Sequence, residues 1–233
     1  MANIIDKIHT TGYWRIIVRP TIFKKDRISS LTQCKEILSD SVVSYRRWSY
    51  PYFNNSSVTN GLDYIEQSCE FGHHVEYWRF YQSAQFVHHF ACSEDYYVND
   101  KYLESLDIGE PSPSGKYLSI LSTLYSITEI FQFVSRLCKK NIFETLVDIS
   151  IGLYGMEGRK LFFNQRSYDL SRSWISSIPE IVFDKSYDNN LIISSAAELA
   201  MEATIFVFER FNWAHQSKII YQEEQRKLLE RRL

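Results

Sequence analysis

The stretch from residue 62 to residue 91 most constrains the fold, because three strand-like runs in it are separated by two short turns. The runs cover Leu62–Glu70, His74–Gln82 and Gln85–Ala91 and are rich in aromatic and β-branched residues. The turns lie at Phe71-Gly72-His73 and at Ser83-Ala84. Strands joined this closely pair antiparallel, so the sequence predicts a β-meander.

The residues before the meander predict a β-α-β order. Apolar and polar residues alternate over Tyr13–Arg19, which predicts a strand that ends at Pro20. Ser30 and Gln33 have the spacing of a capping box, which predicts the start of a helix. A second strand is expected over Val42–Trp48.

The second half of the chain predicts more helix than the first. Its expected elements are a helix over Lys116–Lys139, short strands over Thr145–Gly152 and Arg159–Asn164, a helix from Ser195 to about Phe211, and a charged helix over Ser217–Leu233. The polar segment between residues 165 and 190 has no clear periodicity. We therefore assign no element to it.

Together these elements predict an α+β fold, in which an aromatic-rich antiparallel sheet packs against helices and the C-terminal half is more helical. A chain of 233 residues can bury a core unaided and suits a single domain over residues 1–233. The acidic segment Ser93–Gly115 contains Pro111 and Pro113. It is the expected position of an internal boundary.

Composition excludes several classes of protein. The chain has only 8 glycines, which argues against Gly-rich phosphate loops, and its four cysteines form no C-x-x-C pair. We expect no cofactor. The first ten residues lack the apolar core of a signal peptide, and polar residues interrupt the apolar stretch Leu118–Leu137. These features predict a cytoplasmic protein that does not enter a membrane.

Histidine and glutamate come together in the meander if Ser83-Ala84 is a two-residue turn. Trp78 then faces His89, so His74, Glu76 and His89 share one side of the sheet. Such a cluster could bind a metal ion or transfer protons. No H-E-x-x-H, P-C-x-x-C or G-x-S-x-G motif accompanies it. The sequence therefore predicts no metal site and keeps this cluster as an alternative.

The opposite side of the same strands is expected to carry rings and a cation, a mixture that suits contact with a partner. Its residues are Tyr77, Arg79, Tyr81, Phe86 and His88. We expect these five side chains to form one binding face.

A second candidate binding surface is basic. The first 50 residues hold nine Lys/Arg against four Asp/Glu, a net charge of +5. The arginines of this surface are Arg15, Arg19, Arg46 and Arg47, with tryptophan and tyrosine residues between them. Cations beside exposed rings can hold phosphates and stack on bases. We expect a protein partner or a second copy of the chain, with nucleic acid as the other class of partner.

Arg210 and His215 have the R-x4-H spacing of HEPN ribonucleases and resemble that motif. The resemblance implies an arginine that stabilises phosphate charge and a histidine that acts as acid or base. Phe211 departs from the pattern, because that family usually has a polar residue there. A nuclease or other hydrolase, using Arg210 and His215 or the histidine–glutamate cluster, is therefore the alternative function.

Three segments resemble an uncharacterised family of bacterial proteins, some of which occur with Schlafen-type predicted nucleic-acid-binding modules. They are Trp14-Arg15-x3-Arg19-Pro20-Thr21, Arg46-Arg47-Trp48-x2-Pro51 and Glu76-x-Trp78-Arg79-x-Tyr81-x-Ser83-x-Gln85-Phe86. The resemblance implies a bacterial cytoplasmic protein and transfers no catalytic residue. With no complete catalytic motif in the chain, the sequence favours a non-catalytic binding or accessory subunit.

Overall fold

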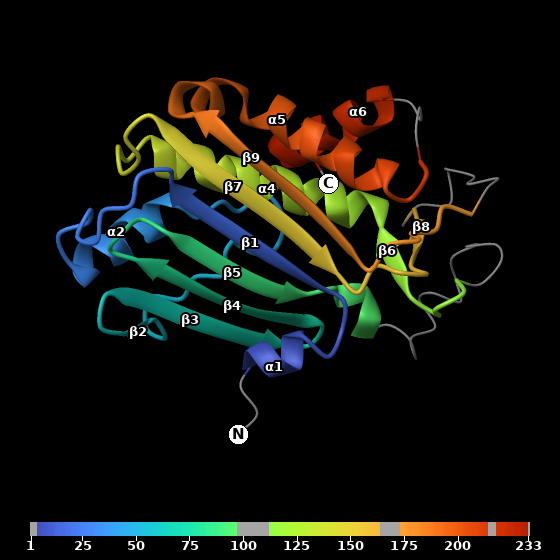
Figure 1. Cartoon of the computed structure of the whole chain (residues 1–233), viewed down its shortest axis with the longest axis horizontal. Helices are drawn as coiled ribbons and strands as arrows, with labels where there is room; N and C mark the ends of the chain where they lie inside the picture. Colours follow the sequence, from blue (N-terminus) through green and yellow to red (C-terminus); the bar gives the residue numbers. More distant parts are fainter. Residues whose placement is uncertain (1–3, 97–111, 164–172, 214–217, 233) are drawn as a thin grey trace.

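A computed structural model describes residues 4–96, 112–163, 173–213 and 218–232. Its centre is a seven-stranded antiparallel sheet (Figure 1). In spatial order the strands are β2 (Thr59–Asn60), β3 (Tyr64–Phe71), β4 (His74–Tyr81), β5 (Phe86–Ala91), β1 (Tyr13–Pro20), β7 (Leu146–Tyr154) and β9 (Glu180–Asp188). The α+β class and the meander of β3, β4 and β5 are confirmed.

The larger helices lie on one face of this sheet, behind the strands in Figure 1. They are α2 (Leu31–Ser41), α4 (Ile120–Cys138), α5 (Asn189–Glu209) and α6 (Lys218–Leu229). A 3-10 turn, η1 (Ser93–Tyr96), follows β5, and the parallel pair β6 (Tyr117–Ser119) and β8 (Lys160–Phe162) lies near the start of α4. We call the helix-covered side of the sheet the inner face and the other side the outer face.

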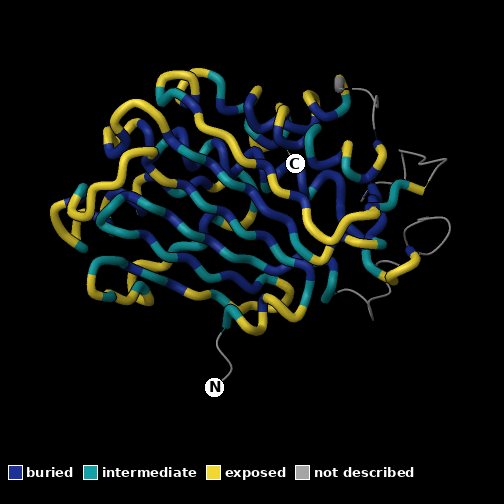
Figure 2. Tube along the Cα trace, viewed as in Figure 1, coloured by how far each residue is buried: buried dark blue, intermediate teal, exposed yellow. Residues whose placement is uncertain are grey.

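The alternation expected for the first strand is confirmed. Trp14, Ile16 and Val18 are buried on the inner face, whereas Arg15 and Arg19 lie on the outer face. Figure 2 shows the same alternation of buried and half-buried positions along the central strands. The main core contains residues from both halves of the chain, so the sheet and its helices share one apolar interior.

The outer face is covered at one end by the short helix α1 (Ile4–Ile8). Ile8 packs there with Val75 and Ala91 in a small second core cluster. Among the described residues no other helix packs on this side of the sheet. The outer face is therefore open over most of its central strands.

The expected strand over Val42–Trp48 is wrong, and with it the β-α-β order. Only an isolated bridge between Val43 and Tyr50 forms there. Both edges of β1 are already taken by β5 and β7. The segment after α2 therefore cannot pair with β1. It crosses instead toward β4 and α4.

The unassigned polar segment contains the edge strand β9, which the sequence analysis missed. Ile181 and Phe183 are buried on its inner face between exposed residues, and the strand pairs along its whole length with β7. The two short strands expected over Thr145–Gly152 and Arg159–Asn164 have different partners. The first pairs with β1 and β9, and the second with β6.

The helix expected to begin at Ser195 begins earlier. Asp188 is its N-cap and accepts hydrogen bonds from the backbone N–H groups of Asn190 and Leu191, while Ser195 has a non-helical conformation inside the element. By length and composition α5 could cross a membrane, and the same is true of many core helices. Here its buried side packs against α4 and β9.

Candidate functional site: a cavity between the sheet and α4

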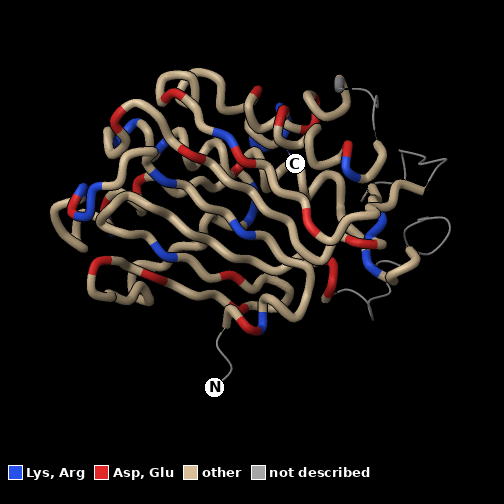
Figure 3. The backbone as a smooth tube through the Cα atoms, in the orientation of Figure 1, with Lys and Arg blue, Asp and Glu red and all other residues tan. Residues whose placement is uncertain are grey.

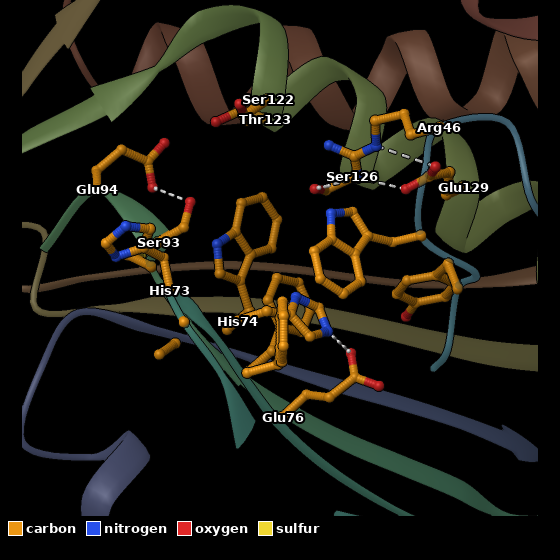
Figure 4. Close-up of a pocket in the computed structure, with 18 of the residues that line it drawn as sticks. Arg46, His73, His74, Glu76, Ser93, Glu94, Ser122, Thr123, Ser126 and Glu129 are labelled. Atoms are coloured by element: carbon orange, nitrogen blue, oxygen red, sulfur yellow. Dashed lines mark hydrogen bonds and ion pairs between the residues drawn. The ribbon is translucent and has the colours of Figure 1, made fainter. Parts of the chain in front are cut away.

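A cavity of about 500 Å³ lies between the inner face of the sheet and the N-terminal half of α4. Its other walls are residues 46–50, the turn at residues 71–74 and η1. Segments from five parts of the chain thus meet around one space. Figure 4 shows polar side chains lying around this space on several sides, with Glu94 and Glu129 far apart.

Aromatic rings make up much of the wall. Trp14 is buried on β1 and stacks on Phe90, with ring centres 5.3 Å apart. Trp48 is 42% exposed and stacks nearly parallel on His74 at 5.1 Å, with Phe71 at 5.8 Å. The rings of Trp48, Phe71 and His74 therefore form one partly exposed cluster at the cavity wall.

Polar side chains in contact with one another line the cavity wall that the sheet forms. Glu76 is buried, and its Oε2 lies 2.9 Å from Nε2 of His74 and 3.4 Å from Nε2 of His88. Its Oε1 accepts a 2.7 Å hydrogen bond from the backbone N–H of Tyr52. The other ring nitrogen of His88, Nδ1, lies 3.2 Å from the hydroxyl of Tyr50. Glu76 thus joins two strands to the segment that follows residue 46.

Two opposing effects set the pKa of Glu76. Burial alone would raise this pKa, because it disfavours the charged carboxylate. The neighbouring imidazoles of His88 and His74 outweigh burial and lower the pKa to about 2. Glu76 is therefore a carboxylate at neutral pH, held by its partners.

The expected cluster of His74, Glu76 and His89 is wrong in its third member, because the hairpin turn is longer than predicted. The backbone N–H of Tyr81 donates to the carbonyl of Gln85, which leaves three residues in the loop. The third of them, Ala84, has a φ of 64°, as in three-residue hairpins built on a type I turn and a left-handed residue.

The longer loop shifts the register by one residue. Trp78 therefore faces His88, and His89 faces Tyr77 on the outer face. There Nδ1 of His89 lies 3.2 Å from Nε2 of His9. Among the described residues no group of three His, Cys, Asp or Glu side chains could hold a metal ion.

The same shift corrects the expected outer binding face. Phe86 and His88 are fully buried on the inner face and cannot belong to the surface of Tyr77, Arg79 and Tyr81. His88 lines the cavity instead, whereas Phe86 packs on Phe133 of α4, with ring centres 4.8 Å apart. The sequence analysis therefore placed Phe86 and His88 on the wrong side of the sheet.

The basic surface expected from the first 50 residues is divided between two places. Arg46 and Arg47 line the cavity, while Arg15 and Arg19 lie on the outer face. Arg46 binds Glu129 of α4 through both carboxylate oxygens, with Nε 3.1 Å from Oε1. It is therefore a clamp between residues 46–50 and α4. Arg47 is exposed and makes no ion pair with any described residue.

Two further polar groups of the cavity were missed by the sequence analysis. Glu94 of η1 is buried and accepts hydrogen bonds from the backbone N–H of Ser119 at 2.9 Å and the hydroxyl of Ser93 at 3.3 Å. Burial raises its pKa. Thr123 of α4 is 1% exposed, and its hydroxyl has no hydrogen-bond partner among the described residues. No local motif marks either residue.

On the outer face the arginines are stacked on rings and mostly paired with acids. Arg15 lies 5.0 Å from the ring centre of Tyr154. Arg79 donates to Glu66 at 2.7 Å, and Arg19 donates to Asp148 at 3.3 Å. Figure 3 shows the two signs of charge interspersed over these strands. A uniformly basic face is therefore not formed.

Arg210 lies just after α5, where its guanidinium stacks on Phe206 and donates to that residue's carbonyl oxygen at 2.9 Å. His215 lies outside the described residues. The structure therefore does not test the pairing of these two residues.

Comparison with known proteins finds no matching family, no similar curated protein and no similar solved structure. The resemblance to an uncharacterised bacterial family stays a prediction.

Proposed function

We propose that the protein is a non-catalytic binding protein and that a small molecule occupies the cavity between the sheet and α4. The observation that carries the proposal is the cavity itself, whose walls combine aromatic rings with the buried hydroxyl of Thr123, for which no described residue is a hydrogen-bond partner. Buried hydroxyl groups normally have a partner, so this one is accounted for by a ligand atom or an ordered water. Concave, mostly apolar sites with a few polar groups are typical of ligand pockets.

The polar groups beside the cavity favour binding over nucleophilic catalysis. Burial raises the pKa of the Tyr50 hydroxyl and of the Cys92 thiol well above their usual values, which keeps both groups protonated and poorly nucleophilic. Glu76 is occupied by His74, His88 and a backbone N–H. These side chains therefore fix the cavity wall and leave no activated nucleophile among them.

A steric block tests this proposal. The probe is 1-anilinonaphthalene-8-sulfonate, a planar dye whose fluorescence rises in apolar sites. Ser122 lines the cavity, so Ser122→Phe should fill the space and weaken dye binding by at least about tenfold. The matched control is Ser194→Phe on an exposed position of α5, which should bind dye like the original protein. Equal dye binding by both variants, with their folds intact by circular dichroism, would overturn the proposal.

A second candidate function, docking of another protein surface, is favoured by the open outer face. Tyr13 and Tyr154 stack there at 4.8 Å beneath Arg15, and Leu146 and Val182 are exposed on the same face. Most cations of this face already pair with its own acids, which disfavours a polyanion such as nucleic acid. A mixed and ring-rich surface suits a protein. A second copy of this chain is the occupant that we test below.

A further inference from the structure

We propose that the ligand of the cavity is a free mononucleotide, with its base among the aromatic rings and its phosphate at Arg47. This inference rests on the proposed binding function and names the chemical class of the ligand. It depends on three features of the cavity: its rings, the polar side chains of Ser122 and Thr123 near the start of α4, and Arg47, which has no ion pair with any described residue.

The rings favour a flat ligand. Trp14 and Trp48 line the cavity from different parts of the chain, together with Phe71 and Phe90. Aromatic side chains prefer stacked or edge-on contact with another π system. Stacking of a base on a protein ring contributes binding energy whichever base is present. A nucleobase therefore suits these walls better than an aliphatic chain does.

The buried polar groups favour a ring with a polar edge over a hydrocarbon ring. Thr123 offers a hydroxyl that can donate and accept, and Ser122 precedes it on the same turn of α4. In Figure 4 both residues lie at the top of the view, with Glu94 to their left and Arg46 to their right. Hydroxyl and carboxyl groups match the ring nitrogens, carbonyls and amino groups along the edge of a base. A purely apolar ring would leave the Thr123 hydroxyl without a partner, which is costly.

The charges favour an anionic group at Arg47. Glu129 is neutralised by Arg46, and Glu76 is held by two imidazoles and a backbone N–H. The exposed Arg47 is the arginine of the cavity that has no ion pair with a described residue. Guanidinium groups bind phosphate through paired hydrogen bonds. A phosphate linked to the bound ring can therefore contact Arg47.

The size of the cavity favours a free nucleotide over a nucleic-acid strand. Its volume of about 500 Å³ is within the usual range for small-molecule sites. A strand would need a basic groove that continues past the cavity. The outer face does not supply one, because Arg19 and Arg79 pair with acids of that face. We therefore infer a single nucleotide unit.

The test is isothermal titration of the full chain with AMP, GMP, CMP and UMP, and with the matching nucleosides and ribose 5-phosphate. At least one nucleotide should bind, its nucleoside should bind about tenfold more weakly, and ribose 5-phosphate should not bind. Arg47→Gln should reduce nucleotide affinity to that of the nucleoside. Arg19→Gln, on the outer face, is its matched control and should leave nucleotide affinity unchanged.

A second pair of variants tests the polar edge. Thr123→Val keeps the shape of the side chain but removes its hydroxyl, and should weaken nucleotide binding by about fivefold to tenfold. Thr204→Val removes a buried threonine hydroxyl of α5 that bonds to the carbonyl of Ala200, outside the cavity. It should leave binding unchanged.

The outcomes separate this inference from the proposed function. If no nucleotide binds but Ser122→Phe still removes dye binding, the cavity is a ligand site and the nucleotide assignment is wrong. If an oligonucleotide of four units binds more tightly than any mononucleotide, a free nucleotide is also the wrong ligand. If the dye is insensitive to Ser122→Phe, the binding function itself fails.

Discussion

The inner face of the sheet is packed under α4 and α5, whereas the outer face of the same strands is open to solvent except under α1. From Tyr77 to Tyr81 on β4 the residues alternate between these two settings. Trp78 and Phe80 are fully buried on the inner face, and Tyr77, Arg79 and Tyr81 are half-buried on the outer face. The outer-face rings, Tyr77 and Tyr81, thus carry hydroxyl groups on the side of the sheet that faces solvent.

The comparison shows that a shift of one residue in strand register moves a side chain from one face of the sheet to the other and so changes its role. His88 and His89 are neighbours in sequence, yet His88 is buried beside Glu76 and His89 lies on the outer face near His9. The same residue type therefore supports the cavity wall on one side of the strand and contributes to the outer surface on the other. The predictions below test this difference between the faces.

The largest expected effect comes from truncating neighbouring rings on opposite faces of β4. Phe80→Ala should lower the free energy of unfolding by about 3–5 kcal/mol, because it leaves a cavity in a close-packed core. Tyr81→Ala should cost about 1 kcal/mol or less, since its ring is partly solvated. Urea unfolding followed by circular dichroism measures both values. Similar losses for the two variants would contradict the assignment of inner and outer faces.

The faces of β1 could be predicted from sequence because they depend on local alternation. The cap of α2 could also be predicted, since the Ser30 hydroxyl accepts from the backbone N–H of Gln33. The side chain of Gln33 accepts from Ser29 instead of Ser30, a detail that the motif alone does not fix. Local signals therefore gave the elements and their ends.

The register and the cavity could not be predicted from local signals. The loop before Gln85 has three residues because Ala84 adopts a left-handed conformation, and no glycine or asparagine marks that position. The clamp between Arg46 and Glu129 joins residues 83 apart in the chain. Such contacts follow from how distant elements pack, which no motif in this sequence records.

A second prediction compares two carboxylates, one on each face. Glu76→Gln should lower the free energy of unfolding by about 2–3 kcal/mol at pH 7, because a buried carboxylate that contacts two imidazoles and accepts a backbone hydrogen bond is lost. Glu66 on the outer face pairs with Arg79 near solvent, so Glu66→Gln should cost less than about 1 kcal/mol. Urea unfolding of both variants at pH 7 measures the difference.

The stability lost in Glu76→Gln should depend on pH, and the lowered pKa of Glu76 gives the direction of that dependence. The pKa of Glu76 is lowered from 4.5 to about 2 in the folded protein. Its contribution to stability is therefore complete above the unfolded pKa and is lost as the pH falls from about 4.5 toward 2. The loss caused by Glu76→Gln should shrink between pH 5 and pH 3. An equal loss at both pH values would mean that the carboxylate charge is not what stabilises this site.

The smallest effect on folding, and the clearest test of the open face, is expected from Arg15→Ala. Arg15 lies over the ring of Tyr154 on the outer face, so its removal should cost less than about 1 kcal/mol of folding free energy. If two copies dock through this face, the same change should weaken self-association by at least about tenfold in sedimentation equilibrium. Lys140→Ala, which breaks an exposed pair with Asp40 away from the sheet, is the control and should leave association unchanged. A protein that stays monomeric at every concentration, with or without Arg15, would remove the second copy as the occupant of this face and leave the cavity as the binding site to pursue.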